Sequence, residues 1–176
     1  MNIESVLSDI IMGLMLLVAV VFDQRERRIP NVLILVALIL GTGWNTFAGS
    51  LDGLLFSIKG LLAGIALLFI PFAMGGMGAG DVKLLGVVGA FKGALFAFHT
   101  FIFMALWGGL IAVILLIAKG ELGKTLHRLW AGFLLALFKV QKMKYSVEAS
   151  NSGVYFPYAL AIALGAVSAY FSLSLM

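Results

Sequence analysis

Two aspartates, Asp23 and Asp81, are the residues of this sequence best suited to chemistry. Asp81 follows a glycine-rich stretch at 75–80 between two long apolar segments, and Asp23 ends the first apolar segment of the chain. An acidic side chain near membrane depth is costly, so it is a candidate for a functional role. Two adjacent carboxyl groups can hydrolyse an amide, because one activates water as a base while the other acts as an acid. Like charges held close cannot both ionise, so such a pair shares a proton.

The composition indicates an integral membrane protein with a single all-α domain, 1–176. The chain has 176 residues, of which 62% are hydrophobic and 11% charged, and its mean hydropathy is +1.13. The absence of cysteine excludes disulfides, thiol catalysis and cysteine-bound metals. The two histidines, His99 and His127, are predicted on opposite sides of the membrane, so we expect no metal and no cofactor. The net charge of +4 is explained by basic loops, and no nucleic-acid partner is expected.

About six apolar segments are long enough to cross a membrane, which takes roughly 20 residues for a helix. No basic residue precedes the first segment, so we interpret it as a retained span and not as a cleaved signal peptide. The basic segment 119–150 contains an apolar patch too short to span, and we expect it to lie on the membrane surface. It binds anionic lipids or, alternatively, helps to dock a partner. The predicted spans are 5–22, 31–47, 54–74, 82–98, 101–118 and 154–173.

The distribution of basic residues predicts the orientation. If the loop at 23–29 is cytoplasmic, so are the turn at 75–83 and the segment 119–150, and these three regions hold ten of the twelve Lys and Arg residues. The positive-inside rule then places the N-terminus outside. Asp23 and Asp81 consequently lie at the same cytoplasmic boundary, where the two carboxyl groups can meet.

The glycines before Asp81 have a role in this interpretation. Gly78 and Gly80 lack side chains that would keep a peptide away from the carboxyl group, and irregular backbone at membrane depth is tolerated where it lines a watery cavity. Glycines inside the spans are expected to be close-packing positions between helices. These are Gly60, Gly64, Gly108, Gly109 and Gly165.

Each candidate also has a structural interpretation. Asp81 could cap the N-terminus of a helix, and Asp23 could be a juxtamembrane charge that pairs with nearby arginines. Arg28 and Lys83 suit a role as cytoplasmic anchors better than one in catalysis. The glycine spacing at 76–80 follows no predicted strand and precedes no Gly-Lys-Ser/Thr, which argues against dinucleotide and P-loop sites.

The two aspartate segments together resemble the type IV prepilin peptidases, membrane-embedded aspartyl proteases of the GxGD type. Residues 78–85, GAGDVKLL, are similar to the second motif of that family. Asp23, followed by RIPN at 28–31, is similar to the first motif. Residues 156–159, FPYA, resemble its C-terminal span, so the resemblance covers the whole chain.

This resemblance implies that Asp23 and Asp81 are a catalytic pair that removes leader peptides, usually after a glycine, from prepilins or pseudopilins. It implies a multi-pass protein of a prokaryotic plasma membrane with its active site at the cytoplasmic face. The chain lacks the cysteine-bearing N-terminal portion of the bifunctional members, so we expect a peptidase without methyl transfer, closest to the short Flp-type forms. The oligomeric state stays open. Supporting residues of the two motifs are Gly78, Gly80, Lys83, Arg28, Pro30 and Asn31.

Two rival functions remain. The presenilin and signal-peptide-peptidase proteases also pair an aspartate after an aromatic residue with GxGD, but they need more spans, and PYAL at 157–160 does not meet their Pro-Ala-Leu signature. A small transporter or channel subunit would also hold intramembrane carboxylates.

Overall fold

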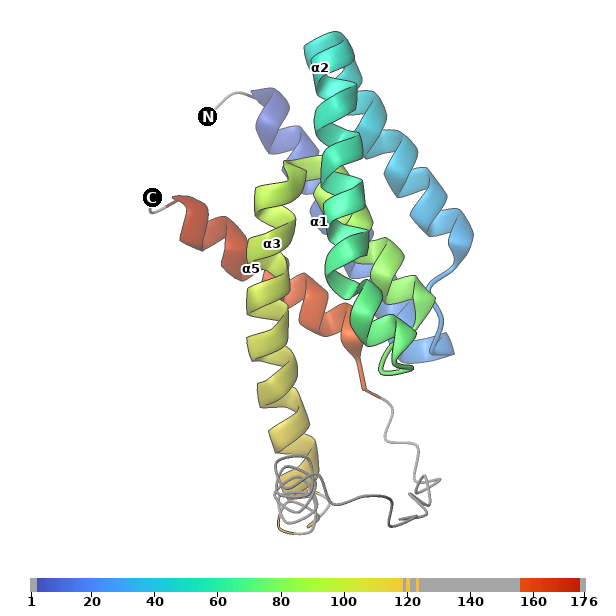
Figure 1. Cartoon of the computed structure of the whole chain (residues 1–176), viewed down its shortest axis with the longest axis vertical. Coiled ribbons are helices and arrows are strands. Elements are labelled where there is room, and N and C mark those ends of the chain that lie inside the picture. The colour runs from blue at the N-terminus through green and yellow to red at the C-terminus, as the bar shows by residue number, and fades with distance from the viewer. Residues whose placement is uncertain (1–2, 119, 121–122, 124–155, 175–176) are drawn as a thin grey trace, which may run out of the picture. The chain divides into compact units, whose positions relative to one another are not determined.

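The part of the protein that its computed structural model describes, residues 3–118, 120, 123 and 156–174, consists of helices and their connections and contains no strand (Figure 1). Three helices, α1 (Ile3–Glu26), α2 (Asn31–Ala73) and α3 (Ala79–Ala118), are long and apolar enough to cross a membrane. The fourth, α5 (Tyr158–Ser174), is apolar but shorter. The prediction of an all-α membrane protein is confirmed, and the count of about six crossings stays a prediction. The basic segment 119–150 lies almost wholly outside the described residues.

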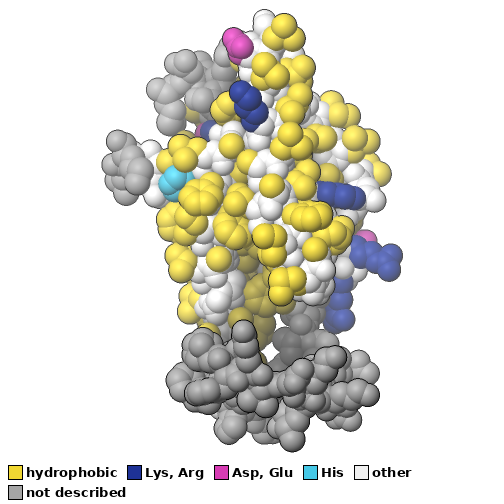
Figure 2. All heavy atoms as spheres, viewed as in Figure 1, with side chains coloured by type: hydrophobic (Ala, Val, Ile, Leu, Met, Phe, Trp, Pro, Cys, Tyr) yellow, Lys and Arg dark blue, Asp and Glu magenta, His cyan; other side chains and the backbone are white. Residues whose placement is uncertain are grey.

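The chain divides into two compact units. The first comprises Met1–Gly108 and Pro157–Met176, and the second comprises Gly109–Phe156. In the second unit the structure describes the last part of α3, two glycines and Phe156. Hydrophobic side chains cover most of the face in Figure 2, as expected for a surface in contact with lipid.

Helices α2 and α3 each contain a break at which the chain reverses (Figure 1). In α2 the break is Ser50, with φ 50° and ψ −130°, which separates an arm at 31–49 from an arm at 51–73. In α3 it is Gly93, with φ 85° and ψ 174°, which separates an arm at 79–92 from an arm at 94–118. Ser50 lies in the connection that hydropathy predicts, whereas Gly93 lies before the predicted connection at 99–100. Hydropathy is insensitive to this second reversal because both sides of it are apolar.

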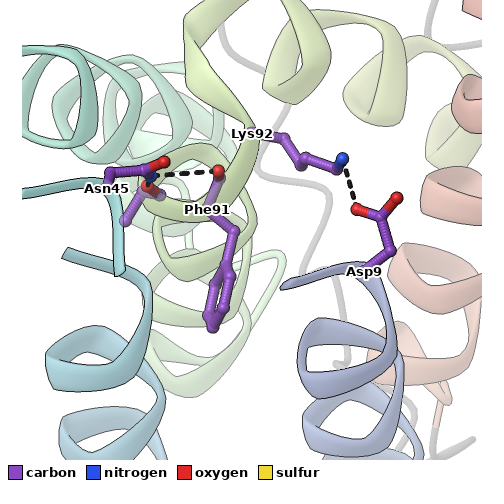
Figure 3. Close-up of polar contacts among 5 residues, drawn as sticks. Asp9, Asn45, Phe91 and Lys92 are labelled. Atoms are coloured by element: carbon purple, nitrogen blue, oxygen red, sulfur yellow. Dashed lines mark hydrogen bonds and ion pairs between the residues drawn. The ribbon is translucent and has the colours of Figure 1, made fainter. Parts of the chain in front are cut away.

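Asn45 stabilises the end of the first arm of α3. Its Nδ2 donates to the carbonyl oxygens of Ala90, at 2.9 Å, and Phe91, at 3.1 Å, and lies 3.0 Å from Oγ of the fully buried Ser57 (Figure 3). The last carbonyls of a helix have no partner within the helix. The amide of Asn45 therefore satisfies carbonyl groups that the break at Gly93 leaves at a helix end.

Glycines bring the second arm of α2 against the first arm of α3. A Cβ atom at Gly64 would lie 2.5 Å from the Leu85 carbonyl oxygen and 2.8 Å from Gly86 Cα, and one at Gly60 would overlap the Gly89 carbonyl. Such backbone contact is typical of helices packed through small residues in membranes. By contrast, a Cβ at Gly109 would meet nothing within 4 Å, so this glycine is not a packing position in the described structure.

The first arm of α3 is the centre of the first unit. Every residue from Asp81 to Phe91 is buried except Lys83. The large side chains of α1 and α2 that face away from it are exposed, as expected for helices surrounded by lipid. Asp81 therefore stands at the start of the most enclosed helix of the unit.

Candidate active site

Three helix ends that are far apart in the sequence meet at one end of the first unit. They are the last turn of α1 with Asp23, the first turn of α3 with Asp81, and the start of α5 (Figure 1). Both carboxyl groups are buried, with 6% of Asp23 and 7% of Asp81 exposed. Burial of an acidic group in an apolar surrounding requires hydrogen-bond partners.

Asp81 is held by the glycine turn that precedes it. The Gly78 N–H donates to Asp81 Oδ2 at 3.2 Å, and the Asp81 N–H donates to the Gly78 carbonyl oxygen, also at 3.2 Å. This reciprocal pair resembles a capping box, in which a side chain of the first turn reaches back to the residue before the helix. The structural interpretation of Asp81 as a helix cap thus describes one of its contacts. It does not account for the second carboxyl group nearby.

Asp23 accepts a hydrogen bond from the start of α5. The Ala159 N–H donates to Asp23 Oδ2 at 3.3 Å. The Pro157 carbonyl accepts the first hydrogen bond of α5, from the Ala161 N–H at 3.3 Å, so Ala159 lies in the first turn, where N–H groups lack helical partners. The partial positive charge at a helix N-terminus also favours a carboxylate there.

The two aspartate segments contact each other directly. A Cβ atom at Gly80 would lie 3.2 Å from Ile29 Cβ, so the absence of a side chain lets the residue after α1 pack on the first turn of α3. Lys83 Nζ donates to Asn31 Oδ1 at 2.9 Å. Asp23 in the last turn of α1 and Asp81 in the first turn of α3 lie on the two sides of this contact. The structure therefore brings Asp23 and Asp81 to one site.

The glycine turn is open on its outer side. Gly75 has φ +76°, a conformation that strongly favours glycine, and a Cβ there would meet nothing within 4 Å. A Cβ at Gly78 would lie 3.2 Å from Asp81 Oδ2, so a side chain at this position would crowd the carboxyl group. Tyr158 closes the turn from the side of α5, where its hydroxyl group donates to the Gly76 carbonyl oxygen at 2.5 Å.

The remaining predicted site residues take different places. Arg28 is exposed, and Pro30 directly precedes α2 as its N-cap residue. Lys83 and Asn31 form the hydrogen bond given above, at the exposed edge of the site. Among the described residues, no three His, Cys, Asp or Glu side chains group together in a way that could hold a metal ion.

Sequence reasoning missed the role of α5 in this site. The contact from Ala159 uses a backbone N–H, which carries no residue-type signal, and the Tyr158 hydroxyl contacts a carbonyl 82 positions away. Pro157 is the only local signal, because proline commonly starts a helix and thus marks a helix N-terminus with free N–H groups. That signal does not reveal which acidic residue the helix N-terminus faces.

Comparison with known protein families assigns most of the chain to a family. The model of the type IV leader peptidase family matches residues 10–117, a range that includes both aspartates and ends before α5. No curated protein and no solved structure matches the chain.

Proposed function

The chain belongs to the type IV leader peptidase family, and we propose that it is an aspartic endopeptidase that removes the leader peptides of Flp-like prepilins or pseudopilins. The observation that carries this proposal is that two buried carboxyl groups, Asp23 and Asp81, lie in contacting helix ends at one end of the unit. The positive-inside distribution supports a location of this end at the cytoplasmic face, and the family implies the plasma membrane of a prokaryote. The reaction then takes place beside the membrane and needs no cofactor.

The proposed mechanism uses the pair as one base and one acid. The ionised carboxylate takes a proton from a water molecule, whose oxygen attacks the carbonyl carbon of the scissile peptide, while the protonated carboxyl group gives its proton to the carbonyl oxygen. As the C–N bond of the tetrahedral intermediate breaks, the carboxyl group that took the water proton gives it to the leaving nitrogen, and the other carboxylate takes back the hydroxyl proton, which restores the pair. The products are a leader with a new carboxyl end and a mature chain with a new amino end.

The surroundings of the pair suit this mechanism. Backbone N–H groups of Gly78 and Ala159 each orient one carboxyl group without adding a competing charge. The glycine turn leaves room on its outer side for an extended substrate, and the Tyr158 hydroxyl holds that turn through Gly76. Rigid support of this kind is what positions catalytic groups within the narrow tolerance that chemistry requires.

The test is cleavage of a synthetic prepilin peptide, with a basic leader that ends in glycine, by the protein purified in detergent. Asp23→Asn and Asp81→Asn should each lower the rate by at least about 100-fold, the usual contribution of acid–base catalysis. Asp52→Asn is the matched control, because it removes an exposed carboxyl group of α2. We expect this control to cleave at the parental rate.

The products also discriminate between the rival functions. Mass spectrometry should show one cut directly after the leader glycine. A cut inside the apolar segment of the substrate would favour a presenilin-like protease, and an intact peptide would favour a transporter or channel subunit. Parental cleavage by either aspartate variant would contradict the assignment of the pair.

A further inference from the structure

A second group of polar residues connects three helices away from the candidate active site. Asp9 of α1 and Lys92 of α3 form an ion pair, with 19% and 22% of their side chains exposed (Figure 3). The Lys92 ammonium group lies 5.6 Å from the ring centre of Tyr170 in α5, a distance suited to a cation–π contact. Helices α1, α3 and α5, whose ends form the candidate site, are thus connected a second time.

The ion pair lies on the same helix faces as the two aspartates of the site. Asp9 precedes Asp23 by 14 positions, which is about four turns of α1. Lys92 follows Asp81 by 11 positions, which is about three turns of the first arm of α3. Residues separated by whole turns share one face of a helix. The faces of α1 and α3 that meet at the ion pair are therefore the faces that carry Asp23 and Asp81.

The distances from the ion pair to the two aspartates differ by about 5 Å, which is less than one helical turn. At 1.5 Å per residue, the ion pair is about 21 Å from Asp23 along α1 and about 16 Å from Asp81 along α3. The side chains between these ends are mostly apolar, for example Met12, Leu16 and Ala19 in α1. Apolar contacts between helices are only weakly specific for one register, because lipid tails are as apolar as the side chains.

A charged pair between apolar helices favours one register of the two helices, which apolar contacts do only weakly. Sliding α1 by a single residue moves its side chains by about 1.5 Å along the axis and turns them by about 100°. Such a shift would separate Asp9 from Lys92 and leave two charges in an apolar surrounding, which is costly. Fixing the register of packed helices is a well-attested role of polar residues between helices.

We propose that the Asp9–Lys92 ion pair, supported by Tyr170, sets the register of α1 against α3 and thereby brings Asp23 opposite Asp81. Asp9 and Lys92 are positioning residues, since they act through the helices and not on the substrate. The consequence for cleavage rests on the proposed function of the site. The register itself can be measured without any cleavage.

A disulfide near the site reports the register directly. The chain contains no cysteine, so a pair of introduced cysteines has no background. A Cβ at Gly80 would lie 3.2 Å from Ile29 Cβ, which is close to the separation of about 3.8 Å found in disulfides. The double variant Ile29→Cys with Gly80→Cys should therefore crosslink rapidly on mild oxidation. Its rate depends on how the end of α1 is aligned with the start of α3.

The ion pair is then changed in this reporter background. Asp9→Asn and Lys92→Met should each slow crosslinking by at least about fivefold, because each leaves one charge without its partner. The exchange of the two residues, Asp9→Lys with Lys92→Asp, should restore the rate to within about twofold, as expected for coupled sites. Lys59→Met, which removes an exposed lysine of α2, is the matched control and should leave the rate unchanged.

The outcomes separate the ion pair from a general loss of folding. Unchanged crosslinking in both single variants overturns the proposal, and so does an exchange variant that is no faster than the slower single variant. If the single variants do not fold, as judged by size-exclusion chromatography and circular dichroism, the exchange variant alone decides by its crosslinking rate. The same substitutions without the cysteines are assayed for cleavage, where single variants should lower kcat more than they change KM and the exchange should recover kcat.

Two outcomes distinguish the register proposal from the proposed function. If the crosslinking rate falls in the single ion-pair variants and recovers in the exchange variant, but Asp23→Asn cleaves as well as the parent, the proposed function fails and the register proposal stands. If the parent cleaves and both aspartate variants do not, while the crosslinking rate is unchanged by the Asp9 and Lys92 substitutions, the register proposal fails and the proposed function stands.

Discussion

Gly64 offers a sharp test of how the site is supported, because its packing can be changed without replacing any polar side chain. It lies in the second arm of α2, where a Cβ atom would come within 2.5 Å of the Leu85 carbonyl oxygen and 2.8 Å of Gly86 Cα. Leu85 is one turn beyond Asp81 in the first arm of α3. We expect Gly64→Ala to push these two arms apart beside the site.

The magnitude follows from the geometry. Ordinary contact begins near 3.4 Å, so the methyl group of Gly64→Ala requires a displacement of about 0.9 Å. Both opposing atoms belong to the backbone of a buried helix and cannot rotate away. An extra methylene group in a packed interior costs about 1–3 kcal/mol, and we expect the upper half of that range. For a chain of this length, 2–3 kcal/mol corresponds to a fall of about 4–12 °C in Tm.

The assay is thermal unfolding of the purified protein in one detergent, with Gly43→Ala as the control. Gly43 is an exposed glycine in the helical first arm of α2, and a Cβ there would meet nothing within 4 Å. Gly43→Ala therefore measures only the stabilisation from the higher helix propensity of alanine relative to glycine, about 1 kcal/mol. Gly60→Ala should be more damaging than Gly64→Ala, because its methyl group would overlap the Gly89 carbonyl. If all three variants melted within about 2 °C of one another, the proposed close contact of α2 and α3 would be refuted.

Two further predictions concern α5 and the reversal in α2. Tyr158→Phe removes the hydroxyl group that holds Gly76 and should lower kcat about 3- to 10-fold, which matches 0.5–1.5 kcal/mol for one hydrogen bond. Ser168→Ala removes another hydrogen bond of α5, from Trp107 at 3.0 Å, and should leave kcat unchanged; equal losses in both variants would contradict a special role for Tyr158. Ser50→Gly should raise Tm by several degrees, because φ 50° with ψ −130° strains a residue with a side chain by about 1–3 kcal/mol. A lower Tm for this variant would show that the Ser50 side chain stabilises the reversal.

Charge and hydropathy predict the helical class of this protein because they are properties of whole segments. They also predict that Asp23 and Asp81 lie at the same membrane boundary, since the predicted side of each loop follows from counting spans and basic residues. How closely the two carboxyl groups approach cannot be obtained in this way. That approach depends on Ile29 packing over Gly80 and on the backbone of α5, and neither contact is encoded by periodicity.

The contacts of single glycines cannot be predicted from charge and hydropathy either. Gly64 and Gly109 are equally good candidates for close packing in the sequence, yet only Gly64 faces another backbone. The two cannot be told apart by hydropathy because lipid tails and neighbouring helices are both apolar surroundings. Gly93 is a different case, since its positive φ marks a reversal inside an uninterrupted apolar stretch.

The first arm of α3 explains why the polar residues of this chain stand where they do. This arm carries Asp81 at one end and Lys92 at the other, and the buried residues between them are otherwise apolar or glycine. The contacts with α2 through Gly60 and Gly64 are close but do not involve charge, so they fix distance better than they fix register. The contact with α1 has the complementary property, because the ion pair at Lys92 constrains register. A two-carboxylate site requires both distance and register, and we therefore expect Gly64→Ala combined with Lys92→Met to lower kcat by more than the product of the two separate effects.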